Sequence, residues 1–257
     1  MNLHQLISYL KFIFSSSNEH GVHSPYVYNL CTKCFYDKKK HNEYKKIKNY
    51  ISHLENSKDI IEIEDFGAGS KVFKDNKRPI SKMAKVAGSD LKEASFLFKL
   101  VKYSKAEEIL EFGTSLGIST YAMEIAGNSK ITTVEGSKAI FDWNKNSSTK
   151  YFEKTTFINS TFEEYLLKLE RDKTFDLIYI DGNHSYKASI EYFNKLKKHI
   201  HNNSIIVMDD IYWSEEMTRA WEEIKNDDLV KVTIDTFHFG LVFFRKEQTK
   251  EHFKIRI

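Results

Sequence analysis

The stretch Ile109-Leu110-Glu111-Phe112-Gly113-Thr114-Ser115-Leu116-Gly117-Ile118-Ser119-Thr120 combines the end of an apolar strand, a glycine turn and the first turn of a helix. Glycine in such a turn allows backbone angles that other residues rarely adopt, and it lets a ligand lie directly against the main chain. The unpaired N–H groups at the start of the following helix favour a negative group such as a carboxylate. The stretch therefore predicts a ligand-binding turn between a strand and a helix.

A second strand strengthens this interpretation. Residues 130–135 form an apolar run that ends in an acid, Glu135, 18 residues after Gly117. A carboxylate at the tip of the second strand, about 20 residues beyond the glycine turn, is the usual partner of a ribose diol in a nucleotide-binding βαβ unit. The two strands together indicate a site for a cofactor that contains a nucleoside.

From residue 89 onward, predicted strands and helices alternate, which is typical of an α/β fold with a parallel sheet and helices on both faces. The last two strands differ, because the three residues between 229–237 and 241–244 permit only an antiparallel hairpin. The other predicted strands are 107–112, 130–135, 155–159, 175–181 and 204–209, and the predicted helices are 89–104, 116–127, 137–149, 162–171, 185–201 and 214–226.

The length of 257 residues suits one large α/β domain with an appendage. We expect residues 1–88 to form a helical extension with a basic loop, and residues 89–257 to form the cofactor-binding domain. The extension begins with apolar residues at helical spacing over 1–14, which predicts a helix packed on the main domain or on a second subunit, with membrane-surface contact as the alternative. Lysine-rich residues 37–58 are interpreted as a solvated helical face, and residues 71–88 as a basic loop at the mouth of a site.

Composition excludes some classes of function. The formal net charge of +3 is small and its charges are interspersed, so nucleic acid is not an expected partner. Cys31 and Cys34 form a single C-x-x-C pair, which is too few ligands for zinc and fits reduced structural thiols in the cytoplasm. The apolar N-terminal stretch is too short to span a bilayer and has no cleavage site of a signal peptide.

A competing glycine turn occurs at Gly67 and Gly69, after the apolar run 60–63. No apolar helix follows it, and no second strand ending in an acid appears. The turn at Gly113 and Gly117 is therefore the better candidate for the cofactor loop.

Two later strand ends carry acidic residues. Asp181 ends the predicted strand 175–181 and is followed by His184, while Asp209 and Asp210 end the strand 204–209. Ligands of open α/β sheets bind beyond the carboxyl ends of the strands, so we expect these side chains on the edge that also holds Gly113 and Glu135. Carboxylates gathered there would suit Mg²⁺ or Mn²⁺, although Asp209 or Asp210 could instead cap the next helix. A histidine at such a strand tip can accept a proton near neutral pH.

Taken together, Glu111-x-Gly113-x-x-x-Gly117, Glu135, Asp181-Gly-Asn-His184 and Asp209-Asp210 resemble class I S-adenosylmethionine (SAM)-dependent methyltransferases. The set is most similar to metal-dependent O-methyltransferases with a D-G-x-H motif that act on macrolide sugars, and more distantly to catechol O-methyltransferase. The catechol-type enzymes have Asn at the position of Asp210. The resemblance covers roughly residues 89–245 and implies a Rossmann-like, seven-stranded sheet that ends in an antiparallel hairpin.

The resemblance implies a role for each matching residue. Gly113 and Gly117 would form the cofactor turn, Ser119 would hold the methionine carboxylate, and Glu135 would bind the ribose. His184 would be the general base beside Asp181. The remaining implied cofactor-binding residues are Glu111, Thr114, Ser115, Gly136, Thr161, Phe162 and Asp181, and the implied ligands of Mg²⁺ or Mn²⁺ are Asp181, Asp209 and Asp210.

The function expected from the resemblance is SAM-dependent O-methylation of a small-molecule hydroxyl on a sugar, a catechol-like compound or another secondary metabolite. We expect the protein in the cytoplasm, and a homodimer through the N-terminal helices is a further expectation. Two alternatives remain open. One is a metal-independent N-methyltransferase or a methyltransferase acting on a macromolecule, and the other is a non-catalytic cofactor-binding module.

Overall fold

The computed structural model describes residues 2–63, 76–86 and 89–257, and the chain divides into two compact units. The first unit comprises Met1–Tyr36 and Leu166–Ile257, and the second comprises Asp37–Tyr165. The boundary expected between residues 88 and 89 lies inside the second unit and does not coincide with this division. The competing glycine turn at Gly67 and Gly69 lies outside the described residues.

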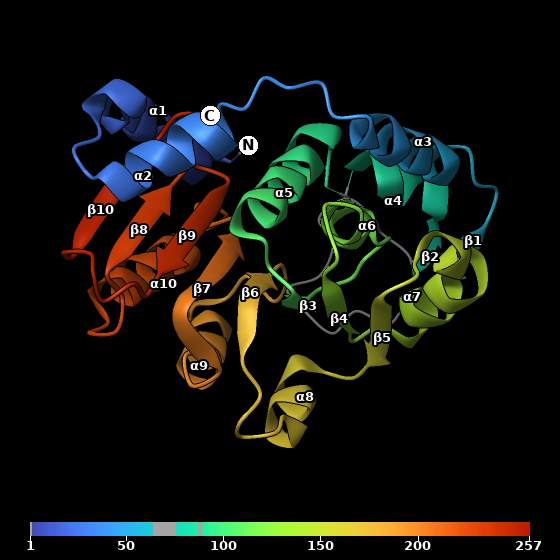
Figure 1. The fold of residues 1–257 in the computed structure, drawn as a ribbon. Coiled ribbons are helices and arrows are strands. Elements are labelled where there is room, and N and C mark those ends of the chain that lie inside the picture. Colours follow the sequence, from blue (N-terminus) through green and yellow to red (C-terminus); the bar gives the residue numbers. More distant parts are fainter. Residues whose placement is uncertain (1, 64–75, 87–88) are drawn as a thin grey trace. The chain divides into compact units, whose positions relative to one another are not determined.

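The first unit contains a mixed sheet with the strand order β10-β8-β9-β7-β6 (Figure 1). Strands β6 and β7 pair in parallel, while β9 runs antiparallel to both β7 and β8, so the predicted C-terminal hairpin is confirmed. Strand β10 pairs in parallel with β8, and the sequence patterns did not indicate it. The strands are β6 (Phe175–Ile180), β7 (Ile200–Asp209), β8 (Val232–Asp235), β9 (Phe239–Phe243) and β10 (Glu251–Lys254).

Helices cover both faces of this sheet. The ring of Tyr26 in α2 lies 5.6 Å from that of Phe243, whereas a Cβ at Gly240 would lie 2.7 Å from Trp221 of α10. Residues 240 and 243 point to opposite faces of β9 because side chains alternate along a strand, so α2 and α10 pack on opposite sides of it. The helices are α1 (Leu3–Ser15), α2 (Pro25–Leu30), α9 (Tyr186–Leu196) and α10 (Glu215–Asn226).

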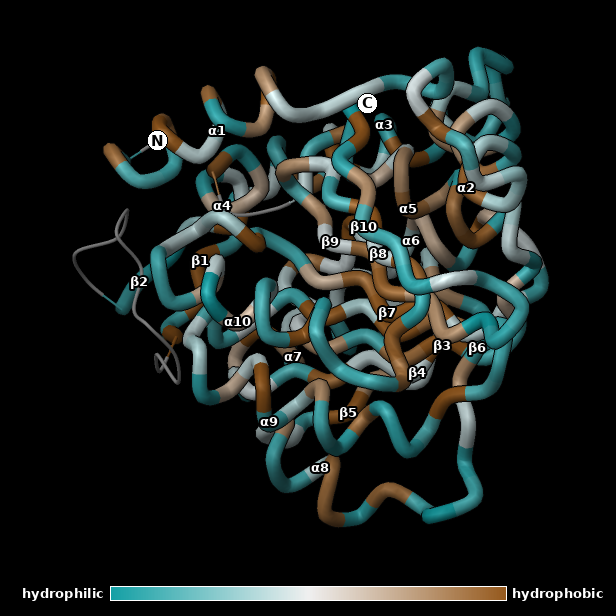
Figure 2. The backbone as a smooth tube through the Cα atoms, turned by 90° about the vertical axis from the view of Figure 1, so that its left-hand side faces the viewer, coloured by the Kyte–Doolittle hydropathy of each residue, from teal (hydrophilic) through white to brown (hydrophobic). Residues whose placement is uncertain are grey.

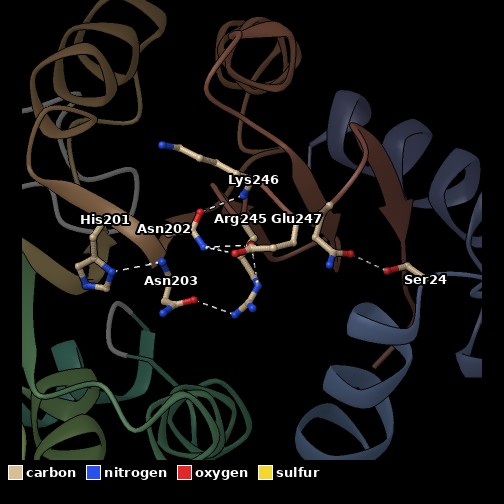
Figure 3. Close-up of polar contacts among 8 residues, drawn as sticks. Ser24, His201, Asn202, Asn203, Arg245, Lys246 and Glu247 are labelled. Atoms are coloured by element: carbon tan, nitrogen blue, oxygen red, sulfur yellow. Dashed lines mark hydrogen bonds and ion pairs between the residues drawn. The ribbon is translucent and has the colours of Figure 1, made fainter.

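The start of β7 is tied to the segment that follows β9 (Figure 3). Asn202 donates to both carboxylate oxygens of Glu247 and accepts from the Lys246 amide, and Arg245 donates to Asn203 at 2.8 Å. These contacts hold residues 200–203 in an extended form, so β7 begins at Ile200. The helix predicted over 185–201 is correspondingly too long, because α9 ends at Leu196.

Both cysteines are free thiols buried in the π-helical turn Cys31–Phe35 that continues α2. Burial, and to a lesser degree the negative charge of Glu19, raises the pKa of Cys31 to about 11. Only roughly one Cys31 side chain in a thousand is then a thiolate at pH 8. We expect iodoacetamide at pH 8 to leave both cysteines unmodified in the folded protein and to alkylate both in urea, as intact-mass measurement would show. Rapid labelling of the folded protein would contradict this burial.

The second unit contains the parallel strands β3, β4 and β5, in that order. Glu111 of β3 bonds side chains of α6, while the adjacent Phe112 stacks on Phe162 of α8, so these helices pack on opposite faces of β3. The strands are β3 (Glu108–Phe112), β4 (Lys130–Glu135) and β5 (Thr155–Asn159). The helices are α3 (Glu43–Glu55), α5 (Leu91–Ser104), α6 (Ile118–Glu124), α7 (Lys138–Trp143) and α8 (Phe162–Lys168), the last of which crosses the division between the units.

Two expectations about the lysine-rich region are corrected. The described residues 77–86 form β2 (Lys77–Pro79), which pairs with β1 (Ile60–Glu62), followed by α4 (Ile80–Val86) rather than a loop, because Ile80 and Met83 are buried. Helix α3 is not only a solvated face, since Ile47, Tyr50 and Leu54 lie fully buried on its inner side. The apolar residues at helical spacing determine which side of α3 is buried, although lysines lie between them in the sequence.

Helix α5 begins at Leu91, two residues later than the predicted helix 89–104. Asp90 accepts hydrogen bonds from the Lys92 and Glu93 amides, and Glu93 accepts one from the Asp90 amide. This reciprocal arrangement satisfies three amides at the helix start, so Asp90 is the N-cap. In the parts of the chain that the structure describes, no helix has the length and apolarity needed to cross a membrane.

Candidate active site

The glycine turn predicted from the sequence connects β3 to α6 in the second unit. Three of its residues have left-handed backbone angles: φ is 98° at Gly113, 47° at Ser115 and 73° at Gly117. The Gly113 amide donates to the Val134 carbonyl of β4 at 3.0 Å, which places the turn at the carboxyl ends of both strands. Gly117 is the N-cap of α6, so the free amides at the start of this helix border the turn.

A buried carboxylate lies beneath this turn. Glu111 is fully buried and accepts hydrogen bonds from Ser119 at 2.6 Å, Thr120 at 2.5 Å and Thr133 at 2.7 Å. These contacts join β3, β4 and the first turn of α6 through one side chain. Glu111 and the Ser119 hydroxyl therefore support the turn from inside, and direct contact of either with the cofactor stays a prediction.

Glu135 lies at the rim of the turn. Its carboxylate accepts from the Ser115 amide at 3.0 Å and from the Ser137 amide at 2.8 Å, and the side chain is half-buried. The structure thus places the acid at the tip of β4 directly against the turn after β3, as the spacing predicted. A carboxylate held in this way can accept hydrogen bonds from a ribose diol at the same edge.

Two further side chains hold the turn, and the motifs did not indicate them. The hydroxyl of Tyr50, from α3, donates to the Leu116 carbonyl at 2.8 Å, and the Asn144 amide donates to the Ser115 carbonyl at 2.7 Å. Burial raises the pKa of Tyr50, so its hydroxyl stays protonated as a donor. In the sequence, the signal for this role is a tyrosine, Tyr50, at an apolar position of the helical pattern of α3.

The adenine-side predictions fall at the end of β5. Phe162 stacks on Phe112 with ring centroids 4.6 Å apart, and the Thr161 hydroxyl accepts from the Glu164 amide at 3.2 Å. The Gly136 carbonyl accepts from Asn159 at 3.3 Å. Thr161 thus caps α8, and contacts of Thr114, Gly136, Thr161 and Phe162 with a nucleoside stay predictions.

Gly117 is expected to tolerate no side chain. An added Cβ would lie 3.0 Å from the Phe152 ring and 3.4 Å from the Tyr50 hydroxyl, on a left-handed backbone. We expect Gly117→Ala to destabilise the fold by about 1–2 kcal/mol, which lowers Tm by several degrees in a chain of this size. The matched control is Gly127→Ala, where a Cβ would meet nothing within 4 Å. Equal Tm values for the two variants in thermal unfolding would contradict the tight turn.

In the first unit, Asp181 and His184 form a pair at the end of β6. The His184 Nε2 atom lies 3.5 Å from Asp181 Oδ1, and the His184 side chain is 22% exposed. Burial acts to lower the pKa of His184, but the hydrogen bond and charge of Asp181 together with the charge of Asp210 outweigh it, and the pKa is raised. Because Nε2 faces the carboxylate, Nδ1 is the ring nitrogen placed to accept a proton from elsewhere.

Asp210 faces the same pair. Its backbone is left-handed, with φ of 50°. Burial raises the pKa of Asp210, and the negative charge of Asp181 raises it further, whereas the positive charges of His184 and His238 lower it; the pKa is raised overall. Asp209 is the last residue of β7 and is paired in register with Phe239. Among the described residues, no three His, Cys, Asp or Glu side chains are gathered closely enough to hold a metal ion. The predicted ligands Asp181, Asp209 and Asp210 therefore do not form a ready metal centre.

One aromatic side chain lies beside the pair, and its neighbour in sequence is fixed by contacts of its own. The rings of Trp213 and His184 lie 5.8 Å apart. The Tyr212 hydroxyl donates to buried Asp235 at 2.5 Å and its ring stacks on Phe237, which fixes the segment between Asp210 and Trp213. The first unit thus places an imidazole beside a carboxylate and an indole ring.

An α/β fold with a mostly parallel sheet, a glycine turn opposite a strand-tip acid, and a terminal antiparallel hairpin is the class I methyltransferase fold. Residues 110–211 match a family described as "Methyltransferase domain". The matched stretch includes both the glycine turn and the His184–Asp181 pair. Over this stretch, which is less than half of the chain, the sequence is similar to methyltransferase domains.

Solved structures with the same fold include three methyltransferases. The SAH-bound PaMTH1 of Podospora anserina has 14% identity and a TM-score of 0.62, covering 88% of this chain and 97% of its own. An O-methyltransferase from Bacillus cereus in complex with SAH has 16% identity and a TM-score of 0.51, with coverages of 81% and 94%. The O-methyltransferase TomG of Streptomyces achromogenes, in complex with SAM and involved in tomaymycin synthesis, has 14% identity and a TM-score of 0.53, with coverages of 85% and 95%.

No curated protein matches the sequence significantly. At these identities the structural likeness establishes the fold. The acceptor and the chemistry of the site follow only from the residues of this chain.

Proposed function

We propose that this protein transfers the methyl group of SAM to a hydroxyl oxygen of a small molecule. The observation that carries the proposal is the His184–Asp181 pair, in which a nearby carboxylate holds the imidazole and leaves its Nδ1 atom for the acceptor. A hydroxyl oxygen must lose its proton as it is methylated, whereas many nitrogen acceptors already carry a free electron pair. A positioned base is therefore the feature that favours oxygen.

The reaction needs little covalent help from the protein. The sulfonium methyl group is already activated, so the acceptor oxygen attacks it directly while the bond from sulfur to carbon breaks and SAH leaves. The hydroxyl proton passes to Nδ1 of His184, and Asp181 stabilises the imidazolium that results. Alignment of the two reactants supplies the remaining advantage, which reaches roughly 7–11 kcal/mol in favourable cases.

In the proposed cofactor site, Gly113 and Gly117 let the methionine part approach the main chain. The amides at the start of α6 suit its carboxylate, and Glu135 binds the ribose hydroxyls in place of, or together with, its present contacts to Ser115 and Ser137. The turn is supported by Tyr50, Asn144 and the Glu111 cluster, so the site keeps its form without the ligand.

Divalent-metal dependence is a separate part of the proposal. Carboxylate oxygens are suitable ligands for Mg²⁺ or Mn²⁺, and Asp181, Asp209 and Asp210 lie at the ends of the neighbouring strands β6 and β7. Their side chains are not gathered as a metal centre in this structure. The transfer described above uses no metal step.

Labelled SAM and a panel of acceptors test the proposal. Catechols, sugars and amines of similar size would be compared, each with Mg²⁺ and with EDTA. We expect label on hydroxyl-bearing acceptors, and mass spectrometry of the product would identify the methylated atom. Transfer only to amines or to a macromolecule would replace the proposal, and binding of SAM without any transfer would indicate a non-catalytic module. Loss of transfer in EDTA with recovery in Mg²⁺ would support the metal part alone.

A further inference from the structure

The N-terminal helix α1 is fixed to the first unit by one side only. The side chain of Asn2, its N-cap, donates to the Trp213 carbonyl at 3.3 Å, and His4 Nε2 lies 3.0 Å from the Thr218 hydroxyl. Further along the helix, Phe12 is buried, and both Tyr9 and Phe12 contact the ring of Phe237. These contacts define the inner side of α1 and determine which side faces away from the unit.

The outer side of α1 is an exposed apolar stripe. Residues 3, 7, 10 and 14 follow helical spacing, with residue 6 beside them, so all five belong to one face. The alternation of hydrophobic and hydrophilic colour along α1 is visible in Figure 2. The exposed fractions are 73% for Leu3, 47% for Leu6, 44% for Ile7, 49% for Leu10 and 88% for Phe14.

The size of this stripe is that of an interface. Its five side chains expose together about as much surface as three fully exposed large residues, or roughly 500–600 Å². A typical protein interface buries about 800 Å² on each partner, and exposed apolar patches of this size mark interaction sites. The stripe is therefore large enough to form the core of a contact between two proteins.

The shape of the surface points to a second copy as the partner. A shallow, open hollow lies on the stripe itself, lined by Ile7, Leu10, Lys11, Phe14, Ser15 and Lys254. Phe14 is the most exposed of the stripe residues and is one of the residues that line this hollow. A protrusion and a hollow on the same surface can fill one another across a two-fold axis, because such an interface pairs each patch with itself.

Charge distinguishes a protein partner from a lipid surface. The thirteen residues of α1 contain one lysine, Lys11, and no acidic residue. Membrane-surface helices combine their apolar face with a strongly charged polar face, whereas the core of a homodimer interface is poor in charge. Lys11 and Lys254 can extend from the edge of the contact to solvent, since long lysine stems pack on apolar surface with the amine in water.

We propose that this protein forms a two-fold homodimer in which the α1 stripes pack together and Phe14 of each protomer packs against the shallow hollow of the other. The proposal is independent of the methyl acceptor. Sedimentation velocity on the full chain, from 1 to 100 μM, tests it. We expect a dimer for the native protein and a monomer for Phe14→Asp and Leu10→Asp, each weakening association by at least a hundredfold.

The control is Leu167→Asp, because Leu167 is 78% exposed in α8 and lies outside the stripe. This variant should remain dimeric, and circular dichroism should show unchanged folding for all variants because each replaced side chain is about half exposed or more. A native protein that stays monomeric at 100 μM overturns the proposal, as does a dimer that persists in both stripe variants. A third outcome is a monomeric native protein that sediments with phosphatidylserine vesicles, together with a Phe14→Asp variant that does not. This outcome would overturn the homodimer and assign the stripe to a lipid surface.

Discussion

Replacing His184 by alanine is expected to lower kcat by about 10²–10⁴-fold, with much less change in KM, since a general base acts in the transition state more than in substrate binding. The reason lies in the pair at the end of β6, where Nδ1 of the ring is left to receive the proton. The loss should shrink for acceptors with acidic hydroxyls, because a phenol ionises without help more readily than a sugar hydroxyl. Steady-state kinetics with one acceptor of each kind would measure both effects.

The chain provides a matched control for this change. His201, at the start of β7, pairs with Asp176 of β6, with Nε2 and Oδ1 3.0 Å apart, at the opposite ends of the same two strands. His201→Ala removes an equivalent histidine–aspartate contact and should leave kcat nearly unchanged. If the two variants lose activity equally, or if His184→Ala turns over at a near-normal rate, His184 is not the base.

Glu135→Ala is expected to weaken SAM binding by about 1–3 kcal/mol, which is a 5- to 150-fold rise in Kd, because the ribose hydroxyls lose their acceptor. Isothermal titration calorimetry with SAH as the stable ligand gives the affinity directly. The variant also loses the contacts to the Ser115 and Ser137 amides. Thermal unfolding without ligand should therefore accompany the titration, to separate lost binding from lost stability.

Asp142→Ala is the control for this second change. Asp142 pairs with Lys138 on α7, shortly after β4, and is 45% exposed, so its loss should alter neither affinity nor stability appreciably. An unchanged Kd in Glu135→Ala would remove the ribose assignment. Gly67→Ala and Gly69→Ala extend the comparison, since a collapse of affinity there would move the cofactor loop to the competing turn.

The central elements could be predicted because their signals are local. Apolar runs between glycines and acids define β3, β4, β6 and β7, and a three-residue connection defines the hairpin of β8 and β9. The mutual position of Ser115 and Glu135 also followed from the sequence, because neighbouring parallel strands end at the same edge.

Features that depend on distant partners could not be predicted. β10 has only four residues, Glu-His-Phe-Lys, and forms because β8 offers an unpaired edge. Tyr50 reaches the Leu116 carbonyl across 66 positions of sequence, and its lysine-rich surroundings indicated a solvated helix. The carboxylates were identified at their strand ends, but side-chain directions decide whether they gather, and sequence spacing does not contain those directions.

The Glu111 cluster has a consequence for how the cofactor is recognised. One buried carboxylate with three hydroxyl donors fixes β3, β4 and α6 in a single arrangement before any ligand arrives. Binding then requires little ordering of the main chain, so more of the contact energy remains as affinity. Because the cluster lies below the turn, SAM and SAH would meet the same rigid floor in the proposed cofactor site. In that proposed site, discrimination between donor and product would come from the charge and bulk of the methylsulfonium group and not from closure of the loop.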